Sequence, residues 1–231
     1  MKKWLQCLIG SMAFCILWGC GTQSHWTRSH QGYKQAPYGE LAVTGIDNAI
    51  VITRSSWFAK RLEIGKDSIH AYLTAFCKKN LTDELHKAYP TLSVIPDTAL
   101  SRFAEESQKV DERIYIKGRI PEQGVEVKDG AGNIPSQILI IHEFIIGTDQ
   151  KRESYFDYAL IHNESAEKAT SKNVTAIVSY TLWDNLKQRA LFNAIDEIQQ
   201  PVIKMSTEEM KALIAKSVQQ IRKNLYEGVV R

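Results

Sequence analysis

His142 and Glu143 are the most noticeable pair of ionisable residues, because they interrupt the apolar run of residues 138–146. A histidine beside a carboxylate can carry acid–base chemistry or bind a metal. Strand alternation, however, sends neighbouring side chains to opposite faces, and the second histidine that zinc proteases need four residues on is missing. We therefore expect one side chain to reach a solvent face or to pair with a neighbouring strand, with no catalytic or metal-binding role.

Acid–base or metal-binding schemes can be drawn for other histidines, but no spacing forces their members together. These groups are His162 with Asp157, His86 with Asp83 and Glu84, and the pair His25 and His30. The sequence also lacks a GxSxG motif, a GxGxxG motif after a strand and a phosphate-binding loop. We therefore assign no catalytic residue, no metal and no cofactor.

The first 19 residues have the layout of a signal peptide. Lys2 and Lys3 precede an apolar run of 15 residues, from Trp4 to Trp18. That length is typical of a signal peptide, whereas a transmembrane helix needs about 20 apolar residues and usually ends at charged ones. A membrane-spanning helix is therefore the second interpretation.

The junction Leu17-Trp18-Gly19-Cys20 resembles the lipobox of bacterial lipoproteins, although Trp18 is larger than usual at its position. The resemblance implies that Cys20 becomes the first residue of the mature protein. It would carry a diacylglyceryl thioether and an amide-linked acyl chain, and two or more chains make a stable membrane anchor. Gly21, in place of an aspartate, implies sorting to the periplasmic face of the outer membrane in a Gram-negative cell. The alternative is an ordinary secretory leader in which Cys20 has no role.

Cleavage at this junction leaves Cys77 as the single thiol that is not lipidated, because Cys7 and Cys15 leave with the leader. No intramolecular disulfide is then possible. Cys77 lies on an apolar helical stripe, so we expect a buried and inert thiol. The alternative is a catalytic pair with His70, seven residues earlier.

The charge balance argues against nucleic acid as a partner. Cleavage reduces the basic side chains from 29 to 27 against 26 acidic ones. A nucleic-acid-binding protein needs a clustered basic face, and near-zero net charge gives no support for one.

Residues 20–39 are polar and show neither helical nor strand periodicity. We predict a lipidated tether here, at most about 60 Å long. Residues 40–231 then form a single periplasmic domain, which is long enough to bury a core of its own.

Three helices are predicted from apolar residues at helical spacing. The first lies between Gly65 and Pro90, with Asp67 or Ser68 as its N-cap. Asp97 caps the second. The capping box of residues 206–209 starts the third, which ends before Gly228. The predicted apolar stripes comprise Ile69, Leu73, Phe76, Cys77, Leu81 and Leu85 in the first helix, Leu100, Phe103 and Ala104 in the second, and Met210, Leu213, Ile214, Ser217, Val218, Ile221 and Leu225 in the third.

Several strands are predicted from alternating or continuous apolar runs. Residues 40–53 read as a bulged strand or hairpin, and residues 138–146 as the central strand, because both of its faces are apolar. The others are residues 92–95, 113–120, 153–162, 174–183 and 188–198, with a long loop at 121–135 and a turn at 185–187. This order predicts an α/β (α+β) sandwich with a mixed sheet of about five to seven strands, antiparallel in its later part, and helices packed on it.

The hairpin before and after Asp184 resembles a late hairpin of periplasmic lipoprotein domains such as the curli-secretion protein CsgG and the penicillin-binding-protein activator LpoB. Residues 177–184 match the apolar strand and its terminal aspartate, while the turn lacks the family's glycine. The order of the other elements over about residues 40–227 is also similar. The resemblance implies a partner-binding envelope domain; Asp184 by itself is explained by a turn in which it bonds the backbone two residues on.

The sequence thus predicts a membrane-anchored, non-enzymatic lipoprotein that binds another envelope protein as an assembly or activation factor. Its contact with the lipid bilayer is through acylated Cys20. A subunit of a CsgG-like secretion pore or ring, and a periplasmic hydrolase that uses His142 or His162, are the alternatives.

Overall fold

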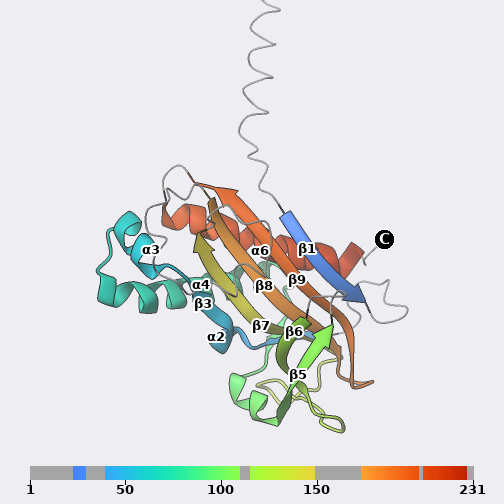
Figure 1. Cartoon of the computed structure of the whole chain (residues 1–231). Coiled ribbons are helices and arrows are strands. Elements are labelled where there is room, and N and C mark those ends of the chain that lie inside the picture. Colours follow the sequence, from blue (N-terminus) through green and yellow to red (C-terminus); the bar gives the residue numbers. More distant parts are fainter. Residues whose placement is uncertain (1–22, 30–39, 110–114, 149–172, 203–204, 228–231) are drawn as a thin grey trace, which may run out of the picture.

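The computed structural model describes residues 23–29, 40–109, 115–148, 173–202 and 205–227. It confirms the predicted α+β class, with a seven-stranded mixed sheet in the order β1-β9-β8-β7-β2-β4, in which β3 also pairs with β7, and a two-stranded sheet of β5 and β6. Figure 1 shows the helices α4 and α6 on one side of the main sheet and the β5–β6 pair on the other. No helix within these ranges is long and apolar enough to cross a membrane.

Three long antiparallel strands form the middle of the sheet. They are β7 (Gln137–Thr148), β8 (Asn173–Asp184) and β9 (Arg189–Pro201). The prediction of a central strand over residues 138–146 and of a hairpin around residues 185–187 is therefore confirmed. The prediction of a strand at 153–162, with His162 and Asp157 in it, lies outside the described residues.

The run of residues 40–53 forms two short strands, β2 (Leu41–Thr44) and β3 (Ile50–Ile52), which both pair with β7 in parallel. A hairpin is therefore the wrong interpretation, and an interrupted strand is the right one. The helical turn α2 (Ile46–Ala49) separates the two strands, and Gly45 enters it with a φ of 89°. A Cβ at Gly45 would overlap the carbonyl oxygen of Ile141, so only glycine fits where the chain leaves the sheet.

The first predicted helix is α4 (Lys66–Ala88), and its apolar stripe is buried as expected, except that Phe76 is only partly buried. Its N-cap is Gly65, which makes no side-chain cap, so the prediction of Asp67 or Ser68 as N-cap is wrong. A further helix, α3 (Ser55–Leu62), precedes it.

The third predicted helix is α6 (Thr207–Glu227), and its capping box is confirmed by the backbone N–H of Glu209, which donates to the Ser206 hydroxyl at 3.2 Å. Its apolar stripe joins the same core cluster as α4 and one face of the sheet. The prediction that helices pack on the sheet is confirmed for α6, because Met210, Leu213, Ile214, Val218, Ile221 and Leu225 are all buried.

The second predicted helix is mostly wrong. Residues Asp97–Arg102 form the short 3-10 helix η1, and the chain then continues as strand β5 (Phe103–Lys109), paired with β6 (Tyr115–Pro121). Phe103 is buried against the sheet face rather than on a helix. The short strand β4 (Ser93–Val94) is as predicted, parallel to β2.

The predicted tether contains a strand, β1 (Gln23–Ser29), which pairs antiparallel with β9. The expectation of no regular structure across residues 20–39 is therefore wrong for this segment. β9 supplies the missing partner, which the local sequence pattern does not reveal.

Candidate functional site

One end of the molecule is built from loops that a single side chain holds together. Asn185, in the turn between β8 and β9, is fully buried. Its Oδ1 accepts from the backbone N–H of Val127 at 3.2 Å, and its Nδ2 donates to the carbonyls of Val127 and Pro135, both at 2.9 Å. Its own N–H donates to the carbonyl of Ser136 at 3.0 Å. The amide thereby fixes residues 122–136 onto the end of the sheet.

Further hydrogen bonds order the same loops. Gly124 donates its N–H to the Gln188 side chain at 2.7 Å, across the two segments. Within the loop, Asp129 accepts from the N–H groups of Asn133 and Ala131, and these bonds hold its pKa below the ordinary value of an aspartate. The loop that sequence patterns show only as turn residues is thus a structured surface.

Asp184 has the structural role proposed from its position before the turn. Its Oδ1 accepts from the backbone N–H of Lys187 at 2.9 Å, three residues on instead of the expected two. The side chain is completely buried, and Lys187 extends outward with its ammonium group 3.9 Å from the same carboxylate. Asp184 therefore closes the turn.

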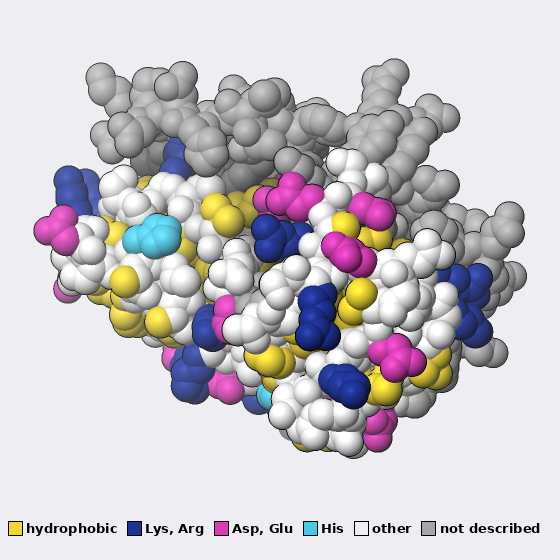
Figure 2. Space-filling model, turned by 90° about the horizontal axis from the view of Figure 1, so that it is seen from below, with side chains coloured by type: hydrophobic (Ala, Val, Ile, Leu, Met, Phe, Trp, Pro, Cys, Tyr) yellow, Lys and Arg dark blue, Asp and Glu magenta, His cyan; other side chains and the backbone are white. Residues whose placement is uncertain are grey.

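A groove of about 530 Å³ opens beside this loop, between η1, the start of β5 and residues 125–128. Phe103 and Val127 in its wall are buried, whereas Arg102, Glu126 and Lys128 at its rim are exposed. The complete lining is Thr98, Ala99, Ser101, Arg102, Phe103, Val125, Glu126, Val127 and Lys128. Figure 2, which views this loop end, shows hydrophobic side chains interspersed with basic and acidic ones.

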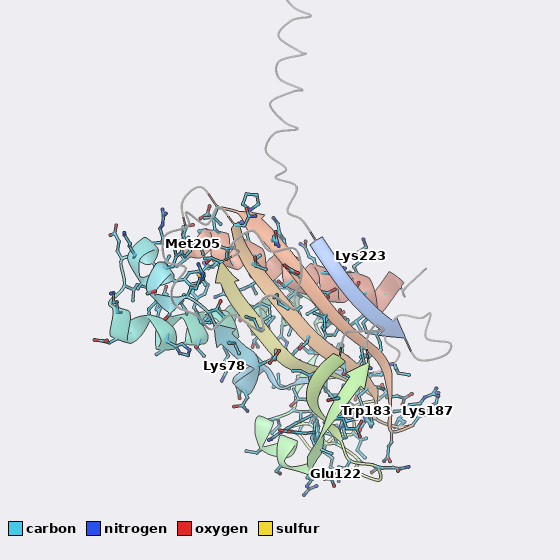
Figure 3. The ribbon with its side chains drawn as sticks, viewed as in Figure 1. Lys78, Glu122, Trp183, Lys187, Met205 and Lys223 are labelled. Atoms are coloured by element: carbon cyan, nitrogen blue, oxygen red, sulfur yellow. The ribbon has the colours of Figure 1, made fainter. Side chains whose placement is uncertain are left out.

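The groove lies far from the start of β1 along the strands. Gln23 at the start of β1 pairs with Ile198, while the loops pack on the turn next to Arg189, nine residues earlier in β9. At the rise of a strand this separation is about 30 Å. Figure 3 shows Glu122, Trp183 and Lys187 gathered at the loop end, away from Met205.

Regular strand alternation predicts that His142 and Glu143 face opposite sides of the sheet, but the two residues face the same side. His142 does not line the groove. A bulge in β7 shifts the register between Ile141 and Glu143. Because Ile141 and Phe144 both pack in the helix-side cluster, the two residues between them face the other side of the sheet. The expectation of opposite faces is therefore wrong.

The imidazole of His142 is a half-buried structural group. The Thr181 hydroxyl donates to Oδ1 of Asn193 at 2.8 Å, so its oxygen accepts from Nε2–H of His142, also at 2.8 Å. A Cβ on Gly118 of β6 would overlap the ring, so this strand can cover His142 only with a glycine. Burial lowers the pKa of His142 to about 4, which keeps the ring neutral at neutral pH.

The other candidate groups do not converge either. Cys77 is buried, as predicted, and burial raises its pKa to about 12, whereas His70 on the same helix is exposed. Near His86, the carboxylate of Asp83 accepts from Lys79 and that of Glu84 from Lys87. Among the described residues no group of three or more His, Cys, Asp or Glu side chains could hold a metal. Cys20, His30, His162 and Asp157 lie outside the described residues, and His25 is described only as part of β1.

Sequence reasoning missed a polar cluster between the sheet and α6. Asp196 of β9 accepts from the Tyr180 hydroxyl at 2.8 Å and from Nδ2 of Asn224 at 2.9 Å, and Gln220 donates to Asn224 at 2.9 Å. Burial raises the pKa of Asp196 to about 7, although both hydrogen bonds oppose the rise, and the pKa of Tyr180 is also raised. An available signal is the position of Asp196 among Phe192, Ala194 and Ile198 on the apolar face of the strand.

Comparison with known proteins gives little. No family model matches the chain, and no curated protein matches it. Among solved structures, the chain is similar to the PelC dodecamer from Paraburkholderia phytofirmans, with 12% identity and a TM-score of 0.39 over 87% of this chain and 98% of that one. A variant of the same dodecamer gives 10% identity and a TM-score of 0.36 over the same shares. These scores are too low to bear on the function of this chain.

Proposed function

We propose that the protein is a lipoprotein of the bacterial envelope, anchored through acylated Cys20, whose domain binds another envelope protein as an assembly or activation factor. The lipobox-like junction of residues 17–20 carries the proposal. The resemblance of the late hairpin to CsgG- and LpoB-like domains supports the partner-binding role. Gly21 after the anchor favours the periplasmic face of the outer membrane.

The position of β1 refines this proposal. β1 begins at Gln23, three residues after Cys20. Three residues span at most about 10 Å, so an acylated Cys20 would hold this end of the sheet against the bilayer while β1 stays paired with β9. The loop end would then point away from the membrane. An anchor that holds the domain at one surface raises its local concentration and strengthens weak binding without new contacts.

Substitution of the anchor cysteine tests this proposal. We expect Cys20→Ala to move the protein from the membrane fraction to the soluble fraction while its thermal unfolding is unchanged, because the substitution removes the lipid and leaves every residue of the described core clusters in place. Cys77→Ala is the matched control, since it removes a thiol that is buried in α4, and it should stay in the membrane fraction. A Cys20→Ala protein that still sediments with membranes and resists salt extraction contradicts the lipid anchor.

The size of the detergent-extracted protein tests the binding role against the ring alternative. A partner-binding factor should migrate as a small species and cross-link to another envelope protein. A large closed oligomer of this chain alone would favour a ring or pore subunit instead.

A further inference from the structure

Both walls of the groove beside residues 125–128 are held in place by hydrogen bonds within the protein. On one side, Val127 is held through both its N–H and its carbonyl by the buried amide of Asn185. On the other side, Phe103 pairs with Pro121 in the β5–β6 sheet, and the Arg102 carbonyl accepts from the N–H of Glu122 at 3.3 Å. Binding in this groove would therefore cost little ordering of the protein.

The lining combines an apolar wall with a rim of net positive charge. Ala99, Phe103, Val125 and Val127 are at least partly buried. The rim carries the cations Arg102 and Lys128 and a single carboxylate, Glu126. Within the described part of the chain neither cation forms an ion pair. Both are therefore available to a ligand, and the guanidinium of Arg102 can bind a carboxylate through two N–H groups.

The shape of the groove favours a polypeptide over a small molecule. Pockets for small ligands enclose most of the ligand surface. Here Thr98, Ser101 and the three charged rim residues are all exposed, so a bound molecule would remain largely open to solvent. An extended segment that alternates apolar and acidic side chains could place the first against the apolar wall and the second on the cations.

We propose that this groove binds a short acidic segment of a partner protein. This inference rests on the proposed function, since it names the chemistry of the partner and the surface that receives it. The groove lies about 30 Å along the strands from the start of β1, at the end that an anchored domain turns away from its bilayer.

Fluorescence anisotropy with a designed probe tests the proposal. The probe is a short fluorescein-labelled peptide in which glutamate alternates with leucine, and the comparison peptide has lysine in place of glutamate. We expect the detergent-extracted full chain to bind the acidic peptide, less tightly at higher salt, and to bind the basic peptide much more weakly. The double variant Arg102→Glu/Lys128→Glu should weaken acidic-peptide binding by more than about tenfold, because like charges then meet across the groove.

The double variant Lys60→Glu/Lys66→Glu is the matched control. It changes the net charge equally, but its lysines are exposed on α3 and α4 and lie outside the groove. Equal loss of acidic-peptide binding in both double variants contradicts the proposal that the groove binds an acidic segment. Equal binding of the acidic and basic peptides contradicts it too. Binding of phosphatidylglycerol vesicles but not of the acidic peptide also overturns it. Such a failure leaves the anchor untouched, because the Cys20→Ala fractionation is read independently of peptide binding.

Discussion

The two faces of the main sheet are both buried, but different chemistry fills them. The face toward α4 and α6 is packed with large apolar side chains from strands and helices. On the opposite face an apolar cluster forms near the loop end, where Ile138, Ile140 and Trp183 meet the β5–β6 pair. Farther along, this face mixes polar side chains such as His142 and Thr181 with the buried side chains of Ile177 and Ile195. The first face therefore provides most of the hydrophobic stabilisation, while the second positions the loops.

Among the titratable groups with shifted pKa values, one on each face matters between about pH 4 and pH 7. Asp196 on the helix side has its pKa raised to about 7, and His142 on the other side has its pKa lowered to about 4. The cause is the same, because burial disfavours the charged form of either group. The two faces should consequently respond to pH with opposite signs. The predictions below test this difference and the packing of each face.

The largest effect is expected from Ile221→Asp in α6. Ile221 is fully buried in the helix-side cluster, so an unpaired carboxylate there should cost several kcal/mol, a large part of the ~5–15 kcal/mol stability of a domain. The purified variant should lose its cooperative thermal unfolding. Gln219→Asp, on an exposed position of the same helix, should unfold like the parent. Parent-like unfolding of Ile221→Asp with loss of partner cross-linking would instead make this face the binding surface.

The next largest effect is expected from Asp196, which makes the stability of the protein depend on pH. The folded protein holds this proton more tightly than the unfolded chain, whose aspartate titrates near 3.8, so this group lowers stability as pH rises from about 4 to about 7. Asp196→Asn should remove that slope and stabilise the protein above pH 7, by up to about 4 kcal/mol. Urea unfolding across this pH range measures it. Unchanged stability at pH 8 would show that the carboxylate is compensated in the folded state.

His142 contributes the opposite slope in an overlapping window. Its folded pKa lies below the ordinary value of 6.5, so its contribution is present above that value and lost as pH falls toward 4. In the parent the two slopes partly cancel. In Asp196→Asn, stability should therefore rise with pH between about 4 and 6.5, and adding His142→Ala should flatten this rise.

The smallest effect is expected at the contact between β6 and His142. Gly118→Ala places a methyl group against the imidazole and should cost about 1–3 kcal/mol, because a packed site resists added volume. The double variant Gly118→Ala/His142→Ala has no imidazole ring for the new methyl group to meet, so its loss of stability should be smaller than the sum for the two single variants. Chemical denaturation should show a coupling free energy of at least about 1 kcal/mol. Additive costs would mean that β6 does not press on the ring.

Much of the fold follows from local patterns. The apolar stripes of α4 and α6 and the Ser206 cap indicate these two helices in the sequence, because each helix has one buried and one solvent-exposed face. The continuous apolar run of β7 correctly marks an interior strand. The groove was not predicted, since its lining comes from two segments more than 20 residues apart in the chain, and nothing in either segment indicates the other.

The sequence by itself determined which segments are helices and strands over most of the described chain, and it gives the lipobox-like junction that carries the proposed function. Only the tertiary structure decided that β1 pairs with β9, that the β7 bulge turns His142 and Glu143 to one face, and that Asp196 meets Asn224. The physical reason is that the first kind of information is local in the chain, whereas the second depends on residues far apart in the sequence. Periodicity records which side of an element is buried, whereas register shifts and buried hydrogen bonds depend on partners that are brought together only when the chain has packed.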